Sequence, residues 1–427
     1  MSDRTVNRSA NRIETAENCD SEFESDWIAV EAALAHIKQH VKPLTDAIKR
    51  PLRDCLGQVL AQSIISPIDV PGHTNSAMDG YALKGADLPD NDVVSLRILG
   101  RAMAGAAFPG TCESGECVRI MTGAIMPAGT DSVVMQEQSE LLDDTTVKIG
   151  SGHRQGQNVR YAGEDIATGS EVFKAGRRIK AADLGVIASF GFAEISVKRK
   201  VRVAFFSTGD ELRSAGETLG DGQIYDSNRY TLFGMLTELD VEILDMGVVV
   251  DQPGAVAQAF EQASQMADVV ITSGGVSVGE ADYIKPTLRK MGNINFWKIA
   301  MKPGRPLTYG QLGNAHFFGL PGNPVAVMVT FLQFVKPALQ RLSGEAFKAP
   351  FRVKAVCQND IRKRPGRTEY QRGIYTQLDD GTLSVELTGR QGSGILSSMS
   401  EANCLIVLHD KQGSVAQGNM VLIEPLN

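Results

Sequence analysis

The residues of this chain that are best suited to chemistry stand together between Asp268 and Asp282. The apolar run Val269–Ile271 predicts a strand buried on both faces of a parallel sheet, and a helix is expected from about Ala281 to Lys290. The loop between them holds the substrate-binding candidates Ser273, Gly274, Gly275, Ser277 and Gly279. Because unpaired amides and the positive end of a helix both attract an anion, a strand, a glycine-rich loop and a helix in this order are typical of phosphate sites.

Two carboxylates, Glu280 and Asp282, lie in the same loop. Carboxylates beside a phosphate are expected when a hard cation such as Mg²⁺ stands between them, since it neutralises both charges and takes oxygen ligands. The segment therefore predicts a phosphorylated ligand with a divalent ion. A second interpretation is that the glycines only shape a tight turn between a strand and a helix.

The chain from Val201 onward alternates between strand and helix patterns. Strands are expected at Val201–Ser207, Val241–Val249 and 268–272, with helices at Arg229–Leu239 and Pro253–Met266. Such alternation predicts a doubly wound α/β sheet that binds ligands at the carboxyl ends of its strands. Polar clusters fall at these ends: Thr208–Glu211, Asp251, the glycine loop, Lys298 with Lys302, and Gly319–Pro324. Independent segments that converge on one edge indicate a functional cleft there.

The composition limits what the chain can do. A length of 427 residues predicts about three or four domains. The net charge of −7 argues against binding to nucleic acid or to an acidic membrane surface. No apolar run approaches the roughly 18 to 20 residues that span a bilayer, and the N-terminus is polar, so a cytoplasmic protein is expected. The six cysteines are scattered, which favours reduced thiols over disulfides or a zinc site.

The regions outside the α/β pattern differ from one another in their predicted secondary structure. Short strands separated by Gly, Pro and Asp predict a small β domain that interrupts the N-terminal domain, and a second set of short strands predicts a small C-terminal β barrel or sandwich. The expected organisation is a disordered tail at 1–25, an N-terminal domain at 26–70 with 158–198, an inserted β domain at 71–157, the α/β domain at 199–344 and the barrel at 345–427.

A helix is expected from about Asp26, with Trp27 and Ile37 on its apolar face. His36 and His40 stand four residues apart on this helix, a spacing compatible with a metal. Since no other ligand type is close in sequence, a solvated histidine pair is expected there.

Seven short motifs stand out along the chain. They are Asn75–Ala82, Met121–Ala124, Gly163–Asp165, Ser207–Leu212, Ser273–Asp282, Lys302–Gly304 and Leu320–Pro324. In this order, over residues 26–427, the chain resembles the molybdopterin molybdenumtransferases, the molybdenum insertases of molybdenum-cofactor biosynthesis. The enzyme module of gephyrin is similar to them.

The resemblance implies an enzyme that inserts molybdenum from molybdate into adenylylated molybdopterin and releases AMP, with the help of Mg²⁺. It also implies a homodimer. Each subunit would have four domains and an elongated form, and its N-terminal domain would itself be elongated. In that dimer the molybdopterin-binding α/β domain faces the inserted β domain of the partner subunit, so that the sites lie at the subunit interface. Other proteins of molybdenum-cofactor biosynthesis are further candidate partners.

The functional residues of the family carry over by position. The catalytic candidates are Asp79, Thr122, Asp165, Glu211, Asp251 and Asp282. The resemblance assigns Asp251 and Asp282 to the adenylate and the metal ion, with Glu280 as a further metal candidate. Lys298 and Lys302 are assigned to phosphate or oxyanion charge.

Four further positions belong to the substrate side of the resemblance. Pro321 and Pro324 are part of the motif that opens the last helix of the α/β domain. Arg372 and Ser393 match positions that the family uses near molybdate, and a guanidinium with a hydroxyl suits a tetrahedral dianion. For Glu211 a surface ion pair is the alternative interpretation.

One segment departs from the family pattern: Gly72-His73-Thr74 stands where Pro-Phe-Asp is common. The change removes a ring and an acid beside the loop of Asp79, and it predicts altered loop packing with the chemistry retained. Two other functions stay open, a non-catalytic molybdopterin-binding scaffold and an insertase that uses tungstate. The retained carboxylates weigh against a scaffold, whereas molybdate and tungstate are too alike in size and charge to be distinguished from sequence.

Overall fold

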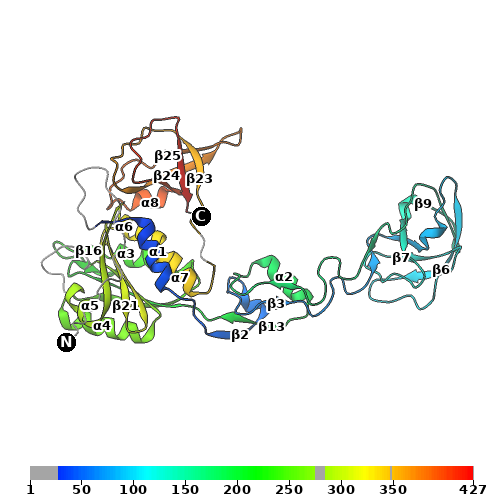
Figure 1. The fold of residues 1–427 in the computed structure, drawn as a ribbon, viewed down its shortest axis with the longest axis horizontal. Helices are drawn as coiled ribbons and strands as arrows, with labels where there is room; N and C mark the ends of the chain where they lie inside the picture. Colours follow the sequence, from blue (N-terminus) through cyan, green and yellow to red (C-terminus); the bar gives the residue numbers. More distant parts are fainter. Residues whose placement is uncertain (1–26, 275–283, 347–348, 427) are drawn as a thin grey trace, which may run out of the picture. The chain divides into compact units, whose positions relative to one another are not determined.

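The computed structural model describes residues 27–274, 284–346 and 349–426, and the tail expected at 1–25 lies outside them. The chain, drawn as a ribbon in Figure 1, divides into two compact units. Each unit has its own hydrophobic cores. The first unit comprises Met1–Ile48, Gly57–Val59 and Lys198–Asn427, and the second comprises Lys49–Leu56 and Leu60–Val197. The domain boundaries expected from the sequence stay predictions, because two units do not separate four domains.

The first unit is built on a seven-stranded sheet with the strand order β1-β19-β21-β22-β18-β14-β17. The strands are β1 (Trp27–Ile28), β14 (Arg202–Thr208), β17 (Glu242–Val249), β18 (Val269–Ser273), β19 (Gly292–Ile299), β21 (Pro306–Leu312) and β22 (Ala315–Leu320). Strand β21 is antiparallel to both of its neighbours, β19 and β22. A tight turn at Gly313, with a φ of +58°, leads from β21 directly into β22. The doubly wound α/β class is confirmed, with this hairpin added.

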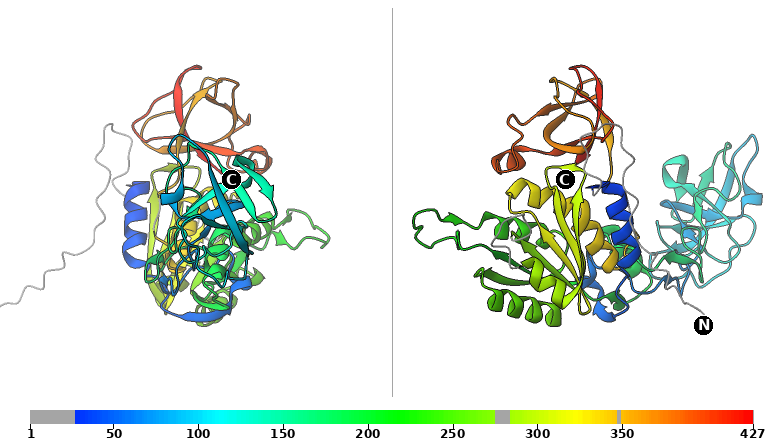
Figure 2. Two further views of the ribbon diagram at one scale, coloured as in Figure 1. Left: turned by 90° about the vertical axis from the view of Figure 1, so that its right-hand side faces the viewer. Right: turned by 60° about the vertical axis from the view of Figure 1, so that its left-hand side comes forward.

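Helices cover both faces of the sheet, as the right-hand view of Figure 2 shows. They are α1 (Val30–His40), α3 (Ser227–Thr237), α4 (Pro253–Met266), α5 (Ile284–Met291), α6 (Pro324–Thr330) and α7 (Lys336–Leu342). Along β14, Val203 and Phe205 join the core that contains α1, α3, α6 and α7, whereas Ala204 and Phe206 join the core that contains α4 and α5. All four side chains are fully buried, which explains the unbroken apolar run in the sequence.

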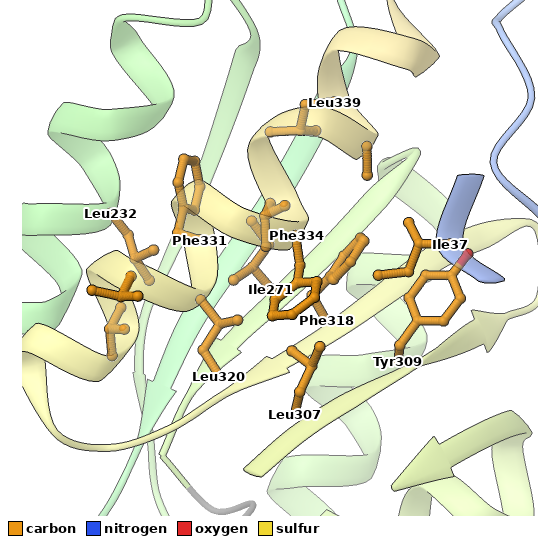
Figure 3. Packing of buried hydrophobic residues seen from close by; sticks show 14 of the residues in the cluster. Ile37, Leu232, Ile271, Leu307, Tyr309, Phe318, Leu320, Phe331, Phe334 and Leu339 are labelled. Atoms are coloured by element: carbon orange, nitrogen blue, oxygen red, sulfur yellow. The ribbon is translucent and has the colours of Figure 1, made fainter. Parts of the chain in front are cut away.

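The helical run Pro324–Leu342 belongs to the first of these cores. It consists of α6, the π-helical turn η4 (Phe331–Val335) and α7. Phe331 and Phe334 of this run pack in one cluster with Phe318 of β22 (Figure 3). By length and composition alone the run could cross a membrane, but 72% of its apolar window is buried inside the protein. The core of the first unit therefore accounts for its apolar character.

The N-terminal segment differs from the sequence prediction. Trp27 does not lie on the helix but on β1, which pairs in parallel with β19 so that Trp27 stands opposite Lys298. The helix α1 begins at Val30, and it buries Ile37 as predicted. The prediction that Trp27 lies on the helix was wrong. A strand of two residues has no periodicity of its own, and the apolar residues of β1 extend the pattern of the following helix.

Of the two histidines of α1, predicted as a solvated pair, His40 is exposed and His36 is partly buried. The rings of His36 and His40 stack with their centroids 4.1 Å apart, and the His36 ring meets the Trp297 ring edge-on at 5.2 Å. Burial lowers the pKa of His36, and the nearby charge of His40 lowers it further. His36 is thus part of the packing between α1 and the sheet, and His40 stacks on it from the solvent side.

The C-terminal part of the first unit is a small closed barrel. Strands β24 (Thr368–Gln377), β25 (Leu383–Leu387), β23 (Val353–Cys357), β27 (Met420–Pro425) and β26 (Cys404–Leu408) pair in this order, and β24 with β26 closes the ring. The predicted barrel is confirmed, and the short helix α8 (Ser397–Glu401) is an addition. Strand β20 (Met301–Lys302) pairs in parallel with the start of β24 and so joins the barrel to the α/β domain.

The second unit contains the predicted small β domain as a six-stranded sheet with the order β8-β5-β7-β6-β10-β9. Its strands are β5 (Gly80–Leu83), β6 (Val94–Ala102), β7 (Glu116–Ile120), β8 (Ser132–Met135), β9 (Ser139–Asp143) and β10 (Thr146–Ile149), with the 3₁₀ turns η2 (Gly85–Asp87) and η3 (Gln136–Gln138). Tyr81 packs on one face of this sheet and Ala82 on the other, as the alternation along a strand requires.

The remainder of the second unit is of mixed structure. It consists of α2 (Ala181–Ser189), the 3₁₀ turn η1 (Leu52–Cys55) and three two-stranded pairings, β2 (Ala47–Pro51) with β13 (Glu194–Lys198), β3 (Ile64–Ile65) with β12 (Glu171–Phe173), and β4 (Asn75–Ser76) with β11 (Val159–Arg160). Asp183 fixes the start of α2, because its carboxylate accepts the Lys180 N–H at 3.0 Å and pairs with Arg177 at 2.9 Å.

Candidate functional site

The carboxyl edge of the seven-stranded sheet borders a cavity of about 730 Å³. Residues that follow three parallel strands line it: Thr208 and Glu211 after β14, Gly274 after β18, and Pro321 after β22. The barrel contributes the loop Gln391–Ser393 to the same cavity. The cleft predicted from the converging strand ends is therefore present within the first unit.

A smaller recess of about 120 Å³ shares Thr208, Glu211 and Gly274 with this cavity. The short strands β15 (Leu212–Arg213) and β16 (Ile224–Tyr225) contribute to its lining, as does the start of α3. Two predicted substrate-binding residues, Ser273 and Pro324, line the recess rather than the larger cavity. The candidates at the strand ends are thus divided between two adjoining spaces.

Positive side chains dominate the charged lining of the larger cavity. Lys302, Arg305 and Arg367 line it, and Glu211 is the acid among its described lining residues. Lys302 is 54% exposed, and its Nζ lies 3.6 Å from Glu369 Oε1. Such an excess of positive charge favours an anionic ligand.

Arg305 and Arg367 were not among the residues chosen from the sequence. The guanidinium carbons lie 4.6 Å (Arg305) and 5.5 Å (Arg367) from the centroid of the Trp27 ring. A ring below a guanidinium restricts the orientation of the guanidinium. Both arginines belong to runs noted in the sequence, next to Lys302-Pro-Gly and before Arg372, but only the placement of Trp27 on β1 brings them together.

Gly274 is the glycine of the loop that the structure describes. Its φ of +87° is a left-handed conformation, and a Cβ at this position would stand 2.8 Å from the carbonyl oxygen of Thr208. Its N–H donates to the Leu320 carbonyl at 3.3 Å, so this amide is not directed at a ligand. The neighbouring Ser273 hydroxyl lies 2.9 Å from the hydroxyl of Ser207. Gly275, Ser277, Gly279, Glu280 and Asp282 lie outside the described residues.

Asp251 and Lys298 stand at the carboxyl ends of β17 and β19 but are not among the described residues lining either space. The Asp251 N–H donates to Asp210 Oδ1 at 3.3 Å, which brings two acids of neighbouring strand ends together. Lys298 stands opposite Trp27 in the β1–β19 pairing. Asp210 lies within the predicted cluster Thr208–Glu211 but was not chosen as a site residue, because the family motif emphasises Glu211 beside it.

Arg372 is buried behind the cavity wall, with 1% of its surface exposed. Its Nε donates to Ser398 Oγ at 3.0 Å and its second terminal nitrogen to the Gly392 carbonyl at 3.1 Å. Burial lowers the pKa of its guanidinium. Ser393 lines the cavity, and its hydroxyl accepts a hydrogen bond from Asn323 Nδ2 at 3.1 Å. Arg372 thus supports the loop that carries Ser393, and a role near molybdate stays a prediction for both.

The metal prediction depends mostly on residues beyond the described ranges. Within residues 27–274, 284–346 and 349–426 no group of three His, Cys, Asp or Glu side chains is arranged to hold a metal ion. Of the three predicted ligands only Asp251 is described. The contact of its N–H with Asp210 brings an acid of the kind that Mg²⁺ prefers close to the Asp251 backbone, and the ion's remaining ligands were predicted beyond the described residues.

The second unit holds the other catalytic candidates. Asp79 Oδ1 accepts hydrogen bonds from the backbone N–H and from the hydroxyl of Thr122, both at 2.7 Å. The backbone bond is the larger cause, and together they hold the pKa of Asp79 below its usual value. The exposed Asp165 donates its N–H to the Val70 carbonyl at 3.1 Å. In the departing segment, the Thr74 hydroxyl accepts the Ala162 N–H at 3.3 Å.

A doubly wound domain with a positively charged cavity at its carboxyl edge, bordered by a loop of a β barrel, defines a protein that binds anionic small molecules. Comparison with known proteins makes this more specific. Three family descriptions match the chain: MoeA N-terminal region (domain I and II) over residues 28–191, probable molybdopterin binding domain over 204–341, and MoeA C-terminal region (domain IV) over 354–426.

Relatives match over almost the whole chain. A molybdopterin molybdenumtransferase of Haemophilus influenzae is 44% identical over 377 residues, which cover 88% of this chain and 93% of that protein. Gephyrin of Dictyostelium discoideum is 32% identical over 91% of this chain and 63% of its own length. The crystal structure of the molybdopterin biosynthesis moeA protein from Pyrococcus horikoshii has a TM-score of 0.82 at 27% identity, covering 93% of this chain and 100% of that one. The chain therefore belongs to the molybdopterin molybdenumtransferase family, and it is a transferase of molybdenum-cofactor biosynthesis.

Proposed function

We propose that this transferase inserts molybdenum from molybdate into adenylylated molybdopterin and releases AMP. The observation that carries the proposal is the cavity of about 730 Å³ lined by Lys302, Arg305 and Arg367. Both substrates are anions, and a cavity with three cations at the carboxyl edge of an α/β sheet suits them.

Some of the described residues bind the anionic substrates, and others orient the groups that react. Lys302 and Arg367 neutralise the charge of the phosphates or of the oxyanion, and charge neutralisation at a phosphoanhydride favours its cleavage. Ser393 offers a hydroxyl to a tetrahedral oxyanion, while Arg372 holds the backbone of the same loop through the Gly392 carbonyl. Glu211 borders both the cavity and the recess, where a carboxylate can orient water.

We assign Mg²⁺ to Asp251, Asp282 and Glu280, of which Asp251 is described beside Asp210. When bound, the ion supplies positive charge at the phosphoanhydride and lowers the cost of charge on the leaving oxygen. The protein residues contribute the oxygen ligands that a hard cation requires.

We further propose a cytoplasmic homodimer in which each site combines Asp79, Thr122 and Asp165 of one subunit with the α/β domain of the other. The support is the family membership and the pairing of Asp79 with Thr122, which fixes one carboxylate in its ionised form. Two-fold symmetry is usual for such dimers and would give two equal sites. Other proteins of molybdenum-cofactor biosynthesis are candidate partners for delivery of the substrate.

The decisive experiment measures AMP release from adenylylated molybdopterin by the purified full chain, with and without molybdate and Mg²⁺. We expect release that depends on both additions and stops when the ion is chelated. The same assay with tungstate shows whether the site distinguishes the two oxyanions. A folded protein that releases no AMP with either oxyanion would show that the proposed reaction is wrong.

A further inference from the structure

One tryptophan side chain lies against two of the three described cations that line the main cavity. The guanidinium carbon of Arg305 is 4.6 Å from the centroid of the Trp27 ring, and that of Arg367 is 5.5 Å from the same centroid. Both distances are inside the roughly 6 Å over which a ring face attracts a cation. Arg305 follows β20 in the α/β domain, whereas Arg367 precedes β24 of the barrel, so a single ring contacts cations from two domains.

Backbone hydrogen bonds fix the position of this ring. Strand β1 pairs in parallel with β19, and the Ala300 N–H donates to the Ile28 carbonyl at 2.8 Å. The Ala300 carbonyl in turn accepts the N–H of Thr368, the residue after Arg367, at 2.9 Å. Ala300 thus connects the strand of Trp27 to the segment of Arg367. The Ile28 side chain packs against the hydrophobic core and anchors the same strand at the edge of the sheet.

The kind of contact matters in a cavity that attracts anions. A carboxylate beside a cation cancels its charge, as Glu369 does in part for Lys302 at 3.6 Å. The face of a ring attracts a cation through its quadrupole and adds no negative charge. A guanidinium held over a ring is also restricted in orientation, so it loses less conformational freedom when it binds an anion. A tryptophan can therefore order the two arginines while the cavity keeps its positive charge.

The two contacts also favour a shared ligand. Because both guanidinium groups lie close to one ring, their positive charges are close to each other and repel. An anion with two or more negative charges relieves this repulsion by binding both groups at once. Phosphoanhydrides and tetrahedral oxyanions are ligands of this kind.

We propose that Trp27 is a positioning residue of this transferase, which holds Arg305 and Arg367 so that both bind the same phosphate or oxyanion group. Trp27 is not among the described residues that line the cavity, so it acts through the two arginines. The inference rests on the proposed function, because it takes an anionic substrate as the ligand of the cavity.

The other interpretation is that Trp27 only completes the edge of the sheet. Its removal would then lower the stability of the first unit and leave the affinity of the folded chain for an anion unchanged. The two interpretations differ in a binding constant, which can be measured without turnover.

The first test measures binding of inorganic pyrophosphate to the full chain by isothermal titration calorimetry in the presence of EDTA. Pyrophosphate is a phosphoanhydride with a charged group at each end, and it carries neither a pterin nor a nucleoside. We expect Trp27→Leu, which removes the ring but keeps an apolar side chain, to weaken binding about tenfold. Trp27→Phe retains a ring and should bind within about threefold of the wild-type chain.

The second test uses the fluorescence of Trp27 itself. The chain contains two tryptophans, so Trp297→Phe leaves Trp27 as the only one. Binding of an anion by the guanidinium groups over the ring should change its emission, with the same dissociation constant that calorimetry gives. In an Arg305→Met chain the loss of affinity caused by Trp27→Leu should shrink to about threefold or less, because the more distant Arg367 then remains.

Trp297→Leu is the matched control. Trp297 lies on the neighbouring strand β19, is 7% exposed, and its ring packs on Tyr309 at 5.5 Å between centroids. Its loss removes the same type of side chain from the same sheet and should lower the thermal stability at least as much as Trp27→Leu. Binding of pyrophosphate should stay within about twofold of the wild-type value, because this ring packs in the core.

Four results would overturn the inference. They are no saturable binding of pyrophosphate by the wild-type chain, unchanged affinity in a folded Trp27→Leu chain, binding without a change in Trp27 emission, and an equal effect of Trp27→Leu in the Arg305→Met chain. These outcomes are separate from those of the AMP-release assay. Failure of the pyrophosphate tests with normal AMP release contradicts this inference alone, and absence of AMP release with the expected pyrophosphate results contradicts the proposed reaction alone.

Discussion

Asp79 and Thr122 are 43 residues apart in the chain, yet the Thr122 N–H and hydroxyl both donate to one oxygen of Asp79 at 2.7 Å. The antiparallel pairing of β5 and β7 brings them together, since Gly80, next to Asp79, stands opposite Ile120. The family resemblance named both residues as catalytic candidates without giving a contact between them. Through these two hydrogen bonds Thr122 favours the ionised form of Asp79.

Thr122→Val should raise the pKa of Asp79 only in part. The backbone N–H of residue 122 is the larger cause of the lowered pKa and survives this substitution, whereas the hydroxyl bond is lost. Carbon-detected NMR titration of the Asp79 carboxyl, with Thr122→Ser as the control, measures the difference. Full return of the pKa to about 3.8 in Thr122→Val would show that the hydroxyl dominates.

Gly274→Ala should destabilise the first unit and weaken substrate binding. A left-handed φ of +87° strains alanine, and its Cβ would stand 2.8 Å from the Thr208 carbonyl oxygen, so we expect a loss of about 1–3 kcal/mol in the free energy of unfolding. The control is Gly234→Ala in the middle of α3, where the added Cβ meets open space and should stabilise by about 0.5–1 kcal/mol. Urea unfolding compares both, and equal stabilities would refute the strain argument.

Asp268 connects the start of β18 to Arg199, and its removal should destabilise the protein in a pH-dependent manner. Burial alone raises the pKa of Asp268, but hydrogen bonds from the Arg199 side chain and the Arg202 N–H outweigh it and hold the pKa below its usual value. The ionised carboxylate therefore contributes stability above about pH 3.8, which is lost as the pH falls through the lower folded value.

The measurement is urea unfolding of Asp268→Asn at pH 7 and in acid. We expect a loss of about 1–3 kcal/mol at pH 7, because the side chains of the pair are only 18% and 23% exposed, and a difference that shrinks in acid. Asp46→Asn is the matched control, since Asp46 also bonds Arg199 but is 61% exposed and should matter by about 0–1 kcal/mol. A larger effect of Asp46 than of Asp268 would reverse this assignment.

The sequence predicted best those parts where burial leaves a regular pattern. Helix α4 begins and ends where its periodicity indicated, and the apolar run of β18 lies in the core of a sheet. It could not show which side chains turn toward a cavity. Arg305 and Arg367 became visible only once Trp27 was placed on β1, because a two-residue strand carries no periodic signal.

A buried oxygen of Asp226 illustrates a second limit. The sequence around Asp226 reads as an ordinary helix start, and capping does explain one of its oxygens. The unused oxygen is a property of the three-dimensional surroundings, namely burial without a donor nearby in the described chain. Accounting for each buried polar atom therefore reveals an unpaired acceptor that residue types and spacing do not.

Arg372→Ala should weaken the use of molybdate more than the binding of the pterin. The substitution removes the bond from the guanidinium to the Gly392 carbonyl, so the loop that carries Ser393 loses a support worth about 1.5–3 kcal/mol. Ser398→Ala is the control, because it removes the 3.0 Å contact to Nε and the hydroxyl's own bond to the Ile395 carbonyl but leaves the guanidinium in place. The molybdate dependence of AMP release and the binding of adenylylated molybdopterin separate the two effects, and a selective loss of pterin binding would exchange the two roles.

The proposed dimer can be tested with two inactive chains. Asp79→Asn should be inactive because an amide replaces the carboxylate that Thr122 holds ionised, and Asp282→Asn because an amide is a poorer ligand for a hard cation. If each site takes Asp79 from one subunit and Asp282 from the other, a mixed dimer contains one intact site and one site with both changes. With random exchange about half the dimers are mixed, so activity should return to roughly a quarter of the wild-type level.

Differently tagged chains must first show that the subunits exchange, and the folded state of each variant is checked by its thermal unfolding. The control mixes Asp79→Asn with Thr122→Pro, which removes the N–H that holds the same carboxylate. Both changes then lie on the same side of the site, so a mixed dimer has no intact site and no activity should return. Exchange without recovered activity in the first mixture means that Asp79 and Asp282 serve the same subunit's site, because every site would then carry a defect.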